Sequence, residues 1–176
     1  MKNSIKNILT HFIVFCVPVI SILFLETLLY IPRFSEFWNV LRLCAFYSGI
    51  YFWLSTREDI FNIISTFILG VFADAIAGTP LGINILTFLF LYIISVYLIS
   101  YFNVKKFSYS WLIFSLILAL TFIFKAFMVM AFFKSTIPFN TFLLELFLTI
   151  CIYPLIIRFY IYVEKKYIHL EERYEN

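Results

Sequence analysis

The chain has 176 residues, of which 64% are hydrophobic and only 13% charged, and its mean hydropathy is +1.00. This composition excludes an ordinary soluble domain and a disordered chain. In so apolar a chain, the formal net charge of +3 does not indicate a nucleic-acid surface, and we interpret it as loop charges that orient membrane helices.

Apolar runs long enough to cross a bilayer follow one another along the chain. A transmembrane helix needs about 20 predominantly apolar residues. The first run follows Lys2 and Lys6, as in a signal peptide, but it is too long for one and no cleavage site follows, so we predict a retained helix. We predict an all-α membrane domain, residues 1–161, with a polar and helical tail, residues 162–176. Its six spans lie at about 8–31, 39–54, 60–77, 81–101, 111–133 and 141–161.

The distribution of basic residues predicts the orientation of the helices. If the N-terminus is cytoplasmic, nine of the 13 Lys and Arg residues lie inside, three lie outside, and Lys125 lies within a span. This bias predicts that both termini are cytoplasmic. Trp38, Trp53 and Trp111 each fall at an end of a predicted span, where amphipathic rings prefer the headgroup level. The three cysteines all fall in apolar runs, where we expect small core residues and not metal ligands: Cys16, Cys44 and Cys151.

Four ionisable residues, Glu26, Asp74, Lys125 and Glu145, lie within predicted spans. Each costs at least about 2.5–3 kcal/mol at the centre of a lipid-embedded helix, so each should have a partner or a water-filled niche. With a cytoplasmic N-terminus, all four lie in the outer half of the membrane. In one interpretation, Lys125 forms one buried ion pair and the other acids reach the outer surface. In the other, the cluster lines a polar cavity open to the outside or receives a polar residue of a partner.

Small residues cluster around Asp74. Gly70, Ala73, Asp74 and Ala77 are spaced at i, i+3, i+4 and i+7, so they share one helical face. Small residues on one face allow a second helix to approach closely, which is how membrane helices associate. We therefore predict that this face packs against another helix or binds a partner, with Asp74 buried beside it.

The residues after this helix predict a tight turn at the outer surface. Gly78 is placed directly after the helix end, where a left-handed backbone favours glycine. Pro80 suits the first turn of the next helix, where its missing N–H costs nothing. Gly82 continues the small-residue pattern. The stretch "AGTPLG" is therefore predicted to close a helical hairpin.

The same stretch, "GVFADAIAGTPLGIN", resembles the signature of the MreD family of rod-shape-determining proteins, Gly-x-x-x-Asp-x-x-x-Gly-x-Pro-Leu-Gly. The upstream "YFWLSTRE", the length and the absence of a soluble domain also resemble that family. The clear resemblance covers Tyr51 to Leu98. The signature positions are held by Gly70, Asp74, Gly78, Pro80, Leu81 and Gly82.

The resemblance implies a non-enzymatic component of the bacterial cell-elongation complex, the elongasome, in the inner membrane. Its implied partner is MreC, a protein with one membrane helix and a periplasmic coiled-coil and β-rich part. The wider assembly implied by the resemblance includes the MreB filament, a RodA-type glycosyltransferase and a penicillin-binding transpeptidase that make peptidoglycan. The family's six-helix arrangement is also similar to the substrate-binding subunits of energy-coupling-factor transporters. The resemblance implies no cofactor, no nucleic acid and contact with membrane lipid.

Two other functions stay open at this point. A substrate-binding membrane subunit of a small-molecule, vitamin-type transporter would use the outer-half polar cluster as its site. An intramembrane aspartyl enzyme would need two carboxylates that share a proton, with Glu26 or Glu145 beside Asp74. The sequence contains no Ser-His pair or His-Glu-x-x-His motif that indicates other catalysis. We expect the chain to be a scaffold and not an enzyme.

Overall fold

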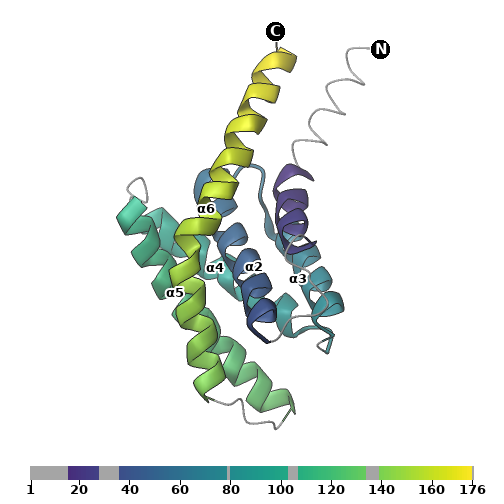
Figure 1. Ribbon diagram of the computed structural model, residues 1–176, viewed down its shortest axis with the longest axis vertical. Helices are drawn as coiled ribbons and strands as arrows, with labels where there is room; N and C mark the ends of the chain where they lie inside the picture. Colours follow the sequence, from purple (N-terminus) through teal and green to yellow (C-terminus); the bar gives the residue numbers. More distant parts are fainter. Residues whose placement is uncertain (1–15, 28–35, 79, 103–106, 134–138, 176) are drawn as a thin grey trace.

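The structure is a computed structural model that describes residues 16–27, 36–78, 80–102, 107–133 and 139–175 (Figure 1). Within these ranges the chain forms six helices and no strand. They are Cys16–Thr27, α2 (Glu36–Thr56), α3 (Ile63–Ala77), α4 (Ile83–Tyr101), α5 (Phe107–Phe133) and α6 (Phe139–Glu175). Short connections make successive helices alternate in direction, so α3 and α4 form a hairpin, as do α5 and α6.

Three of the described helices are long and apolar enough to cross a membrane. These segments are Ile83–Tyr101, Phe107–Phe132 and Phe142–Lys166, and they correspond to the last three predicted spans. Cys16–Thr27 and α3 are apolar but shorter. The remaining residues of the first predicted span lie outside the described residues. The prediction of membrane-spanning helices is therefore confirmed for three helices.

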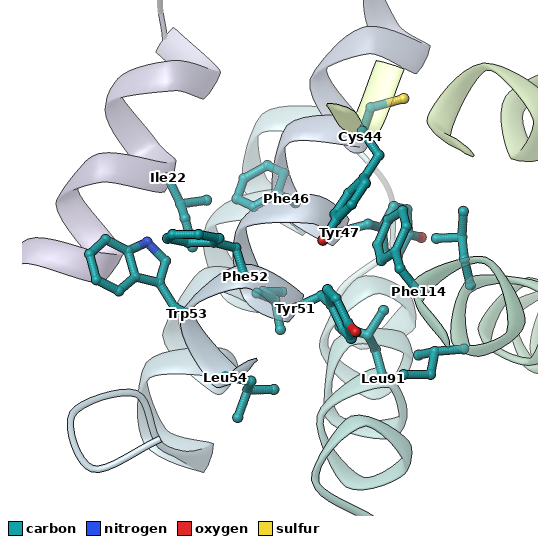
Figure 2. Packing of buried hydrophobic residues seen from close by; sticks show 14 of the residues in the cluster. Ile22, Cys44, Phe46, Tyr47, Tyr51, Phe52, Trp53, Leu54, Leu91 and Phe114 are labelled. Carbon is teal, nitrogen blue, oxygen red and sulfur yellow. The ribbon is translucent and has the colours of Figure 1, made fainter. Parts of the chain in front are cut away.

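Helix α2 lies at the centre of the bundle. It contacts α3, α4 and α6, and every residue from Cys44 to Leu54 is buried. The labelled α2 side chains in Figure 2 point to different sides of the helix. A helix that is buried all round is the interior helix of a bundle, so the other helices are arranged around α2.

The outer surface of the bundle is apolar. Along α5, exposed side chains recur every three or four residues and form one stripe on the side of the helix away from Lys125. The stripe consists of Leu112, Leu116, Leu120, Ile123, Phe127 and Met130. Such a stripe would be a liability in water, whereas in a membrane it faces lipid.

Helix α6 is continuous past the predicted end of the membrane domain. It has 37 residues and is about 55 Å long at about 1.5 Å per residue. The predicted helical character of the tail is confirmed to Glu175, and no break separates the tail from the last span. Pro154 lies inside α6 and cannot donate a hydrogen bond to the carbonyl of Ile150. Trp111 Nε1 donates to that carbonyl at 3.1 Å, so a side chain of α5 replaces the missing bond.

Two predictions about single residues need correction. Trp53 is fully buried and donates from Nε1 to Ser21 Oγ at 3.1 Å, so it is a core residue and not a ring at the headgroup level. Cys151 is exposed on α6, so it is not a core residue. Both errors come from judging a position by its apolar run, which does not tell which side of a helix meets another helix. The side chain of Trp38 lies outside the described residues.

Candidate functional site

The Asp74 carboxyl group joins the two helices of the α3–α4 hairpin. Its Oδ2 accepts a hydrogen bond from the Gly82 backbone N–H at 2.7 Å, and its Oδ1 accepts one from the Asn84 N–H at 3.0 Å. The Asp74 and Asn84 residues are only 1% and 2% exposed. Both carboxyl oxygens are thus used at the N-terminus of α4, which explains how an acid is accommodated inside an apolar bundle.

Asp74 performs the task that the N-cap residue normally performs. The first backbone N–H groups of a helix have no partner within the helix, and a side-chain oxygen at the N-cap usually accepts from them. The N-cap of α4 is Gly82, which has no side chain and makes no such bond. Asp74 supplies the acceptor from the preceding helix, at the end of α4 where the helix dipole favours negative charge.

Gly70 brings the same two helices into close contact. A Cβ atom at this position would lie 2.6 Å from Ile85 Cα, a distance that neighbouring backbone cannot tolerate. Gly70, Ala73 and Asp74 are buried, whereas Ala77 is exposed. The predicted small-residue face therefore packs, through its first three members, against α4 of the same chain.

The turn between α3 and α4 depends on two glycines with positive φ. Gly78 ends α3 with φ 63°, as predicted for the residue after the helix. Gly82 precedes α4 with φ 116° and ψ −24°, outside the region that L-residues with a side chain adopt. The prediction for Pro80 is wrong, because α4 begins at Ile83 and Pro80 lies in the turn before it. The left-handed backbone of Gly82 is not helical, so α4 can begin only after it.

We expect Gly82→Ala to destabilise the chain more than Gly78→Ala does. Neither new Cβ would meet another atom within 4 Å, so the difference isolates backbone strain. Gly78 has ordinary left-handed angles, which cost alanine about 1 kcal/mol, and Gly78→Asn should cost less. At Gly82 the cost should be about 2–3 kcal/mol. Thermal unfolding of the purified variants in detergent measures the two losses of stability. Equal losses for Gly82→Ala and Gly78→Ala would contradict the prediction.

A second polar cluster lies between α5 and α6. Lys125 Nζ lies 3.4 Å from Glu145 Oε1, and the two side chains are 17% and 14% exposed. Lys125 Nζ also lies 5.6 Å from the centre of the Phe122 ring. The predicted ion pair of Lys125 is confirmed, and Glu145 is its partner.

Residues of α2 complete this cluster from the centre of the bundle. Cys44 Sγ and Thr149 Oγ1 lie 2.9 Å apart and join α2 to α6. Thr149 Oγ1 in turn donates to the Glu145 backbone oxygen at 2.7 Å. Tyr47 is fully buried, and its ring centre lies 5.4 Å from that of Phe122, the ring over which Lys125 Nζ lies. Helices α2, α5 and α6 thus all contribute polar groups to one region.

Removing one member of the ion pair should be costly, whereas removing both should not. We expect Lys125→Met to lower the free energy of unfolding by about 3–5 kcal/mol, because Glu145 would remain buried without its counter-ion. The double variant Lys125→Met with Glu145→Met should lie within about 1 kcal/mol of the natural chain. Thermal unfolding in detergent tests this, and a double variant as unstable as the single one would contradict the ion-pair explanation.

Glu26 is the fourth ionisable residue within the predicted spans. It is 1% exposed near the C-terminal end of the helix Cys16–Thr27. The interpretation in which the acids other than the Lys125 partner reach the outer surface is therefore wrong for both Glu26 and Asp74. Each is buried in the bundle, Glu26 near the end of Cys16–Thr27 and Asp74 within the hairpin.

The close packing around Gly49 is not among the features predicted from the sequence. A Cβ atom there would lie 2.6 Å from Tyr160 Oη and 2.7 Å from Ile22 Cγ1. Tyr160 Oη donates to the Ala45 backbone oxygen at 3.0 Å. Three helices thus cross closely at Gly49, and a single glycine within an apolar run is the only sequence signal for this crossing.

Comparison with protein-family models, with curated proteins and with solved structures finds no match to this chain.

Proposed function

We propose that the chain is a non-enzymatic membrane scaffold of the bacterial cell-elongation complex, of the MreD type. It lies in the inner membrane with six spans and both termini in the cytoplasm. The three helices that are both long and apolar enough to cross a membrane are α4, α5 and α6, and the other three pack with them in the bundle. Its partner is a single-span, MreC-like periplasmic protein, and peptidoglycan synthases associate with the pair. On this proposal, the six helices are arranged as in the substrate-binding subunits of energy-coupling-factor transporters.

The observation that supports this proposal is the pair of hydrogen bonds that Asp74 accepts from backbone N–H groups within the α3–α4 hairpin. Four of the six signature residues, Gly70, Asp74, Gly78 and Gly82, build one local hairpin in the structure. These residues therefore have a structural role in stabilising the hairpin. A scaffold requires such a hairpin, and this role involves no substrate.

The geometry favours a scaffold over an aspartyl enzyme. A pair of catalytic aspartyl groups shares one proton at close range. Asp74 instead binds the backbone N–H groups of Gly82 and Asn84 with its two oxygens, and Glu145 is paired with Lys125. Both groups are engaged in holding helices together.

Affinity purification of the full-length chain from native membranes in mild detergent, with mass spectrometry of the co-purified proteins, tests the proposal. We expect a single-span protein with a large periplasmic part, together with peptidoglycan synthases. A pair of ATPases with a second membrane subunit would overturn the proposal in favour of a transporter subunit. Recovery of the chain without any stoichiometric partner would also overturn it.

A further inference from the structure

Arg158 is a charged residue on the outside of an apolar helix. It lies within the segment Phe142–Lys166, which is long and apolar enough to cross a membrane, and it is exposed. Arginines in membrane segments are costly and almost always face a bundle interior or a water-filled cavity, where they find a partner. Among the described residues, however, Arg158 makes no hydrogen bond and no ion pair. The bundle itself therefore gives no reason for a charge at this position.

Arg158 is part of an exposed face of α6 that changes from apolar to basic along the helix. Residues three or four positions apart lie on the same side of a helix. Six exposed residues follow one another at this spacing: Phe147, Cys151, Leu155, Arg158, Tyr162 and Lys166. The apolar half up to Leu155 and the basic half from Arg158 are each about 12 Å long at about 1.5 Å per residue.

The basic half of this face has no acid to balance it among the described side chains. The nearest acid in the chain is Glu164, which is partly buried. The charges that act on it are those of Arg57 and Lys165, and Lys165 is its direct neighbour in the chain. Arg158 and Lys166 make no ion pair within the described residues, so two cations on this face have no counter-ion there.

The group that complements this face is an anion joined to a long apolar chain. An arginine guanidinium donates two parallel hydrogen bonds to a phosphate, and a tyrosine hydroxyl and a lysine ammonium each add a donor. Tyrosine is also enriched at the headgroup level of membranes. A soluble anion would match only the basic half of the face, whereas an anionic phospholipid matches both halves.

We infer that this face of α6 binds an anionic phospholipid. The phosphate of the lipid accepts from Arg158, Tyr162 and Lys166, and its acyl chains lie along the apolar half. In the proposed orientation the lipid belongs to the cytoplasmic leaflet, whose surface potential is negative. The inference goes beyond the scaffold function and needs no partner protein, so each of the two can fail without the other.

Native mass spectrometry of the full-length chain in mild detergent, titrated with phosphatidylglycerol or with phosphatidylcholine, tests the inference. We expect the natural chain to bind the first phosphatidylglycerol at least about tenfold more tightly than the first phosphatidylcholine, since each cation near a headgroup contributes about fivefold. Arg158→Gln should weaken phosphatidylglycerol binding about fivefold, and Arg158→Lys should lose less because it keeps the charge. Without added lipid, the thermal midpoint of Arg158→Gln should equal that of the natural chain.

The matched control is Arg57→Gln, which removes the same charge from a residue that is paired with Asp59 at 3.5 Å. Its phosphatidylglycerol affinity should stay within about twofold of the natural value. Equal affinities of the natural chain for the two lipids would overturn the inference. Equal losses for Arg158→Gln and Arg57→Gln would also overturn it, because only net charge would then matter. So would displacement of the lipid by an equal concentration of glycerol phosphate, because a soluble anion would then occupy the site without the apolar half.

Discussion

Asp74→Leu is expected to lower the free energy of unfolding by about 3–5 kcal/mol, the largest effect of any polar substitution in the α3–α4 hairpin. The substitution leaves the N–H groups of Gly82 and Asn84 without the oxygens that accept from them at 2.7 and 3.0 Å. Asn84 is buried, so water cannot easily replace the lost bond. Thermal unfolding of the purified variant in detergent, together with its level in native membranes, measures the effect.

Asp74→Asn is the matched control for this prediction. Its carboxamide keeps one acceptor oxygen and places an NH₂ group against the other backbone donor, so it should lose roughly half as much stability as the leucine variant. If Asp74→Leu leaves the protein level and the thermal midpoint unchanged, the capping role of Asp74 is wrong.

Gly70→Leu is expected to separate α3 from α4 and to cost at least about 3 kcal/mol. The position where its Cβ would lie is 2.6 Å from Ile85 Cα, and helix backbone cannot move aside as a flexible side chain can. Gly70→Ala already introduces this Cβ, so it should show most of the loss. Disulfide crosslinking of cysteines placed on the facing sides of α3 and α4 measures the separation.

Ala75→Leu is the control for bulk. Ala75 is exposed on the same helix, so the added side chain meets lipid and should change the thermal midpoint little. Equal losses for Ala75→Leu and Gly70→Leu would show that α3 tolerates no larger side chain anywhere, and would contradict a specific contact at Gly70.

The hairpin could be predicted from the sequence because its determinants are local. Gly70, Asp74, Gly78 and Gly82 lie within a few helical turns, so their spacing indicates a shared face and a turn. The spacing could not tell whether that face receives a partner or the next helix of the same chain. The spacing also did not predict that Asp74 caps the N-terminus of α4, or that Pro80 lies outside that helix.

The contacts of α2 could not be predicted, because they join residues far apart in the chain. Cys44 meets Thr149 and Ala45 accepts from Tyr160, and no sequence spacing encodes these pairs. For the same reason, the sequence could not show which of Glu26, Asp74 and Glu145 pairs with Lys125. An apolar run shows that a helix enters the membrane, but only the packed bundle shows which of its sides face protein.

The central position of α2 has a consequence for the biogenesis of this protein. Between Cys44 and Leu54 the helix is enclosed on all sides, and α6, one of the helices that enclose it, is synthesised after the other described helices. Until α6 enters the membrane, the side chains of α2 that later meet it face lipid or a membrane insertase. The bundle can therefore close around α2 only after α6 has been made, and a chain truncated before α6 would be a substrate for membrane quality-control proteases.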